Sequence, residues 1–177
     1  MVDLQNRALR RNLVKSNDYI LREKTIPFDF ENPTVDPIDL RDIMMYNSIH
    51  HGGIGLAAPQ IGLPYSVFAL GNPKDEESIM VMFNPNIVSY SDDVVKMEEG
   101  CLSFPSLALN IKRPASIRIR YSDYTGKIET IKMEGATARI AQHEYDHLSG
   151  ILYTSKANTT DLDRAKHRQK IMNRRRA

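Results

Sequence analysis

The sequence predicts an α+β fold, because short apolar segments of strand type come before helical segments rather than alternating with them. The length of 177 residues is that of one domain, so we interpret residues 1–177 as a single domain. Hydrophobic residues make up 41% of the chain and charged residues 26%, an ordinary globular mixture that excludes a disordered chain.

Three segments have helical signals, at residues 36–49, 136–148 and 160–172. The first opens with an aspartate in the N-cap position followed by a proline, and Gly52 and Gly53 end it. The second is a run of good helix formers that ends before Gly150. Thr160, with Asp163 three residues later, resembles a capping box that opens the third.

Apolar runs and alternating patterns predict strands at residues 65–70, 79–83, 94–97, 116–121 and 127–133. The last two strands flank the turn sequence Asp123-Tyr124-Thr125-Gly126. We therefore expect them to form an antiparallel hairpin.

Cysteine content and hydropathy limit the class of protein. Cys101 is the only cysteine, which excludes a disulfide framework and favours a reducing compartment. No apolar run approaches the roughly 20 residues that span a bilayer, so no membrane association is expected.

Charge is distributed unevenly along the chain. The net charge of +2 does not by itself indicate a nucleic-acid partner, and we expect no binding to DNA. Residues 159–177, however, hold seven basic side chains against two acidic ones. A basic C-terminal helix at about residues 160–176 is either a solvated terminal helix or a surface that attracts an anionic partner.

The pattern His143-Glu144-Tyr145-Asp146-His147 carries the strongest chemical signal. On a helix, the two histidines project from one face on successive turns and can share a metal ion, with Glu144 close enough to take a proton from water. The alternative is a surface helix whose histidines pair with Glu144 and Asp146.

A catalytic metal site of this kind needs a third protein ligand. The residues after the helix, namely Asp161, Asp163 and His167, have no convincing context for that role. Cys101 is the better candidate, because Gly100 before it permits a tight backbone approach. A lone cysteine is otherwise more often an inert core residue.

A further segment, Gly53-Ile54-Gly55-Leu56-Ala57-Ala58-Pro59-Gln60, packs small residues around one polar amide. It lacks the third glycine and the lysine of phosphate-binding loops. It is either a glycine-rich loop that leads into a strand or a loop that brings backbone and the Gln60 amide to a substrate.

Three segments together resemble the signatures of the peptide deformylase family: GIGLAAPQ at 53–60, EGCLS at 99–103 and QHEYDHL at 142–148. They occur in the family's order, and the resemblance covers roughly residues 36–155. It implies a single catalytic domain in which antiparallel sheets pack around a central helix carrying HExxH, followed by a C-terminal helix. It also implies that Tyr19–Arg22 is the family's usual first strand.

The resemblance implies a metal-dependent hydrolase that removes the formyl group, as formate, from the N-terminal methionine of new polypeptides. Cys101, His143 and His147 would hold one divalent ion, typically iron(II) in the cell, although zinc, nickel or cobalt suit the same ligands. Glu144 would take the proton of the attacking water. The Gln60 amide and the Leu102 backbone N–H would stabilise the oxyanion.

For the substrate, the resemblance implies strand addition at a sheet edge, with Gly55 as a backbone contact. The methionine pocket is expected beside Ile54, Met97, Ile140 and His143. Arg139 stands where many bacterial members have an apolar residue, and it either covers the pocket with its aliphatic stem or pairs with an acidic neighbour.

The family also suggests that Arg113 meets Asp146, the alternative being an exposed contact worth less than about 1 kcal/mol. Two other functions remain open at this stage. One is a zinc endopeptidase that uses the same HExxH pattern, and the other is a catalytically silent relative that binds the ribosome through its basic C-terminal end. A milder hypothesis keeps the deformylase activity and adds docking on the ribosome through the basic C-terminal end.

Overall fold

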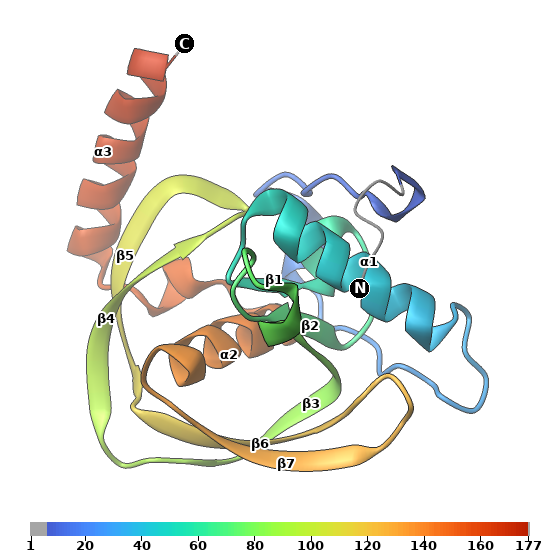
Figure 1. Cartoon of the computed structure of the whole chain (residues 1–177). Helices are drawn as coiled ribbons and strands as arrows, with labels where there is room; N and C mark the ends of the chain where they lie inside the picture. Colours follow the sequence, from blue (N-terminus) through green and yellow to red (C-terminus); the bar gives the residue numbers. More distant parts are fainter. Residues whose placement is uncertain (1–6, 177) are drawn as a thin grey trace.

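Two antiparallel sheets surround one helix in the computed structural model of the chain, which describes residues 7–176 (Figure 1). The central helix is α2, Gly135–Leu148, which contacts strands of both sheets. The expected α+β class and the sheets around the HExxH helix are therefore confirmed.

The larger sheet has five strands in the order β1-β2-β3-β6-β7, and every neighbouring pair is antiparallel. Their bounds are Gly55–Ala57, Val67–Leu70, Met80–Tyr90, Ser116–Ser122 and Ile128–Glu134. The predicted hairpin is confirmed, because β6 and β7 pair from Ser116 opposite Glu134 to Ser122 opposite Ile128.

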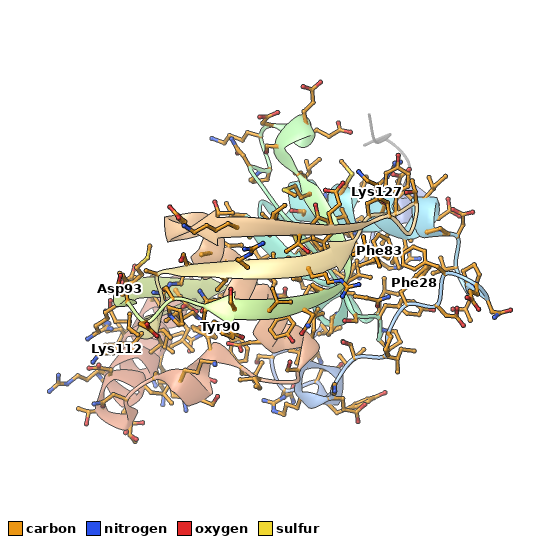
Figure 2. The ribbon with its side chains drawn as sticks, turned by 90° about the horizontal axis from the view of Figure 1, so that it is seen from below. Phe28, Phe83, Tyr90, Asp93, Lys112 and Lys127 are labelled. Carbon is orange, nitrogen blue, oxygen red and sulfur yellow. The ribbon has the colours of Figure 1, made fainter. Side chains whose placement is uncertain are left out.

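Strand β3 is longer than predicted, since it passes through Asn84-Pro85-Asn86 instead of ending at Phe83. Turn-forming residues suggested an end there, but the strand accommodates them with a shift in register between Phe83 and Asn86 and a φ of 48° at Asn84. The Asn84 side chain also bonds both the N–H and the C=O of Phe28. Phe28 consequently packs on Phe83 at one end of the sheet (Figure 2).

The smaller sheet consists of β4, Val94–Cys101, and β5, Phe104–Pro114. The predicted strand at 94–97 was too short, and β5 was not predicted. Prolines are uncommon inside strands, but Pro105 and Pro114 lie at the two ends of β5, while Leu107, Leu109 and Ile111 alternate toward the core.

Helix α1, Pro37–His51, confirms the first helical prediction. The Asp36 side chain accepts hydrogen bonds from the N–H groups of Ile38 and Asp39, and Gly52 ends the helix in the left-handed conformation. Leu40 and Met44 bury one face of α1 in the core formed with β1 and β2.

Residues Tyr19–Arg22 form a 3-10 helix, η2, rather than the expected first strand. The side chain of Asp18 accepts a hydrogen bond from the N–H of Ile20, which favours a turn. A single parallel bridge between Ile26 and Tyr65 is the strand-like contact of this region.

Helix α3, Thr159–Arg176, packs against β5 through Ala165 and Leu162 and then extends away from the body (Figure 1). The expected capping box was wrong, because the side chain of Asn158 accepts hydrogen bonds from the first N–H groups of the helix. None of the helices among residues 7–176 combines the length and apolar composition needed to cross a membrane.

Candidate active site

Cys101, His143 and His147 meet where the end of β4 approaches α2. The two histidines lie one turn apart on the same helix face, with ring centroids 5.1 Å apart. Sγ of Cys101 lies 3.3 Å from Nε2 of His147. One ligand atom from each of the three residues lies within 4.8 Å of the others.

This donor set fits a divalent metal ion. Ligand bonds of about 2.0–2.3 Å around a tetrahedral ion place neighbouring ligand atoms about 3.3–3.7 Å apart, close to the observed spacing. Burial, followed by the charges of His143 and Arg113, lowers the pKa of His147 to about 3, so this ring is in the neutral form that binds metal. The three residues would leave a fourth coordination position open.

Glu99 forms a hydrogen bond with the ring of His143. Its Oε2 lies 2.9 Å from Nδ1 of His143, which turns Nε2 of that ring toward the thiol. Burial lowers the pKa of His143, but the hydrogen bonds with Cys101 and Glu99 outweigh this effect and raise the pKa to about 10.

The carboxylate of Glu99 is itself held by two arginines. Arg113 donates to both of its oxygens, at 2.6 and 2.9 Å, and Arg139 donates to Oε1 at 2.8 Å. Burial raises the pKa of Glu99, but the hydrogen bonds from Arg113, His143 and Arg139 hold it well below its usual range. Glu99 thus remains charged in a nearly closed environment. Sequence reasoning assigned no role to Glu99, although an acidic residue two positions before the cysteine was the available signal.

Arg113 also contacts Asp146, as the family resemblance suggested, with its Nη1 2.6 Å from Oδ2. The alternative of an exposed contact was wrong, because both side chains are buried. Burial opposes the charge of Arg113, but Glu99 and Asp146 raise its pKa. The arginine therefore links β4, β5 and the metal-site helix.

Glu144 is buried beside the three ligands. Burial raises the pKa of its carboxyl to about 7. Among the described residues, its Oε2 and Nδ1 of His147 are buried side-chain atoms without a hydrogen-bond partner. A carboxyl that changes protonation near neutral pH and keeps one oxygen without a partner can act as a general base.

The side-chain amide nitrogen of Gln60 lies beside Cys101. Its Oε1 accepts a hydrogen bond from the N–H of Ala57 at 2.8 Å, which fixes the orientation of the amide. Its Nε2 lies 3.4 Å from Sγ of Cys101 and 3.3 Å from Oγ of Ser103. The loop interpretation in which Gln60 reaches toward a substrate is consistent with this placement.

A cavity of about 560 Å³ opens beside Cys101, His143, Glu144 and Gln60. The expected substrate residues Ile54, Gly55, Arg139 and Ile140 line it, as does Leu102, the expected backbone donor to the oxyanion. Met97 does not. It lines a separate hollow, whose walls also include Arg139.

Comparison with known proteins agrees with this geometry. Residues 10–163 match the family described as polypeptide deformylase. The chain belongs to this family. The two other classes considered from the sequence, a zinc endopeptidase and a silent binding module, are not needed to explain the fold or the site.

Relatives of the deformylase family occur in plants and bacteria. A chloroplastic/mitochondrial peptide deformylase 1B of Arabidopsis thaliana is 39% identical over 85% of this chain and 55% of its own length. A peptide deformylase of Agrobacterium fabrum is 38% identical over 70% of this chain and 74% of its own. The chain therefore spans about half the length of the plant relative and three quarters of the bacterial one.

Solved deformylase structures share the fold. A plant peptide deformylase superposes with a TM-score of 0.82 at 34% identity, covering 93% of this chain and 90% of that one. The Synechococcus elongatus deformylase, solved in complex with actinonin, gives 0.81 at 30% identity, covering 90% and 88%.

Proposed function

We propose that this chain hydrolyses the formyl group, as formate, from the N-terminal formylmethionine of newly made polypeptides. The observation that carries the proposal is the convergence of Cys101, His143, His147, Glu144 and Gln60 on one cavity in a chain of the deformylase family.

We further propose that Cys101, His143 and His147 hold the ion. A divalent ion held there would polarise the formyl carbonyl and lower the pKa of a water molecule. Cys101 would supply the sulfur ligand, and Glu99 fixes the orientation of the His143 ring.

Glu144 supplies the proton transfers. Its carboxylate accepts the proton of the attacking water and afterwards gives it to the nitrogen of the departing methionine. A pKa of about 7 suits both steps at neutral pH.

The carbonyl oxygen of the formyl group becomes negatively charged when water attacks. The amide of Gln60 and the backbone N–H of Leu102 are the donors proposed for this charge. Because Ala57 already fixes the amide of Gln60, no reorganisation is needed in the transition state.

The peptide would extend between two strand edges. β1 is an edge strand of the large sheet, and β4 pairs only with β5 among the described strands. Residues from Gly52 to Gly55 and from Glu98 to Leu102 line the cavity. The methionine side chain would contact Ile54 and Ile140 in this cavity.

The ion is proposed to be iron(II) in the cell, with zinc, nickel or cobalt in a purified sample, since one thiolate and two imidazoles suit all four. The compartment is proposed to be one with bacterial-type translation, either the cytoplasm or an organelle.

A ribosome contact through α3 is a separate proposal. The side chains of Arg164, Lys166, Arg168 and Lys170 are exposed along this helix and would attract ribosomal RNA. Replacing Arg164, Lys166 and Lys170 by glutamine should reduce co-sedimentation with ribosomes at low salt. Undiminished binding of that variant would contradict the contact.

The proposed reaction is tested by formate release from formyl-Met-Ala. The wild type should release formate and should leave the internal bonds of an unformylated peptide intact. Glu144→Gln should lose on the order of 100-fold or more in kcat while keeping its metal content. Cleavage of the internal bonds, or full activity of the variant, would contradict the proposal.

A further inference from the structure

One arginine separates two hollows in this molecule. Arg139 lines the catalytic cavity of about 560 Å³ and also a second hollow of about 430 Å³. Met97 lines the second hollow and not the catalytic cavity. The side chain of Arg139 therefore stands between the two spaces.

Hydrogen bonds fix the guanidinium end of the Arg139 side chain. The Arg139 guanidinium donates to Oε1 of Glu99 at 2.8 Å, to the carbonyl of Ile111 at 2.9 Å and to the carbonyl of Val95. The side chain thus crosses from α2 to β4 and β5, and the residue is only 6% exposed. Bonds to three fixed acceptors make a single conformation favourable.

The length and chemistry of an arginine side chain suit it to separate the two hollows. Its aliphatic stem can present apolar surface to a bound side chain, while the charged end is satisfied at the strands behind. A shorter apolar residue would leave the carbonyls of Val95 and Ile111 without the donor they now have. It would also leave space between the two hollows.

The second hollow lies toward the end of the molecule where β3 passes into β4. Its walls include Asp93, which Figure 2 shows at that end of the sheet, together with Ser116, Lys132 and Glu134. Ser116, Lys132 and Glu134 belong to β6 and β7, which carry none of the proposed metal ligands, while Val95 and Met97 of β4 complete the wall next to Arg139.

We propose that Arg139 determines the depth of the pocket for the first side chain, closing it at about the length of methionine and keeping it separate from the second hollow. This inference rests on the proposed deformylation. It makes Arg139 a specificity-determining residue that limits side-chain length.

The test uses formylated dipeptides whose first residue is methionine, 2-aminooctanoic acid or 2-aminodecanoic acid, each followed by alanine. Arg139→Ala should join the two spaces, so the ratio of kcat/KM for the longest substrate to that for methionine should rise at least tenfold. The gain should appear mainly as a lower KM for the long substrates, because the added methylenes can then contact the apolar part of the second hollow, Val95, Met97 and Pro114.

Lys132→Ala is the matched control. It shortens another long cation on the wall of the second hollow without touching the catalytic cavity, so the length profile should stay that of the wild type. Circular dichroism and the melting temperature of each variant show that it is folded.

Met97→Ala tests the partition without removing a buried charge. If Arg139 separates the spaces, enlarging the second hollow at Met97 should leave the length profile unchanged. A shift toward long substrates in Met97→Ala would show that the two spaces already communicate, and would overturn the inference.

Two further outcomes are distinct. If folded Arg139→Ala loses the same factor in kcat/KM for every substrate, the residue has a structural role only and the inference is wrong. If the wild type releases formate from none of the substrates, the proposed function itself is wrong, and the inference that rests on it is withdrawn as well.

Discussion

A methyl group on Gly55 would lie 2.3 Å from Oε1 of Glu144. The edge of β1 and the proposed general base therefore approach as closely as they do only because position 55 has no side chain. The same methyl group would lie 2.7 Å from Cγ2 of Ile140 on the adjoining turn of α2. One glycine thus sets the spacing between the proposed peptide-binding edge and the helix that carries the metal ligands.

Gly55→Ala should therefore lower kcat for formyl-Met-Ala by at least tenfold, because the buried Glu144 carboxylate must move from its present position. Metal content should stay near that of the wild type, since the three proposed ligands are not touched. The control is Gly100→Ala, because a methyl group at Gly100 meets nothing within 4 Å. Equal kcat values for the two variants would contradict this account.

Gln60→Leu should lower kcat by about 100- to 1,000-fold, since one oxyanion donor is typically worth ~2.7–4 kcal/mol. The change keeps the volume of the side chain nearly constant and leaves Cys101 and the histidines in place. Steady-state kinetics and metal analysis check the two halves of the statement. Turnover close to that of the wild type would show that the amide is not an oxyanion donor.

Acid should weaken the contribution of Glu99 to stability. In the fold, burial raises its pKa, but Arg113, His143 and Arg139 lower it far more, so the folded chain binds this proton less readily than the unfolded chain does. The stabilisation is then complete above the unfolded pKa of about 4.3 and is lost as the pH falls toward the folded pKa.

The measurement is urea unfolding of the metal-free wild type and of Glu99→Gln between about pH 6 and pH 3. The difference in free energy of unfolding should be largest near pH 6 and should shrink toward pH 3. The exposed Glu77→Gln serves as control and should differ little from the wild type throughout. A difference for Glu99→Gln that does not change with pH would be inconsistent with a charged, arginine-bound carboxylate.

The iron(II) form should lose activity in air, and the nickel form should retain it, because iron beside a thiolate is readily oxidised. Both forms are prepared anaerobically from the same metal-free chain and assayed for formate release during exposure to air. Equal rates of decay for the two forms would argue against iron oxidation as the cause.

Local patterns predicted those parts of the fold that local forces determine. The Asp36-Pro37 cap, the glycines after α1 and the alternation in β6 are signals that tertiary packing leaves unchanged. Strand β5 and the second half of β3 were missed, because prolines and asparagines in them resemble turns. Packing overrides that preference by a bulge at Asn84 and by placing Pro105 and Pro114 at the ends of β5.

The site shows a similar division. The metal ligands, Glu144 and Gln60 stand in short segments whose chemistry is visible in the sequence. The contacts of Glu99 and Arg139 depend on β4, β5 and α2 meeting in space, with partners 40 residues apart. The position of Met97 behind Arg139 depends on the direction of one long side chain, and residue spacing carries no information about that direction.

The most direct test of the metal centre is the electronic spectrum and metal content of the cobalt(II) form. The wild type should bind one cobalt ion per chain and show the sulfur-to-cobalt charge-transfer band of a thiolate ligand. Cys101→Ser should lose that band, and His147→Ala should bind far less cobalt. A full equivalent of cobalt in Cys101→Ser with an unchanged spectrum would show that the sulfur is not a ligand, and the proposed chemistry would fail with it.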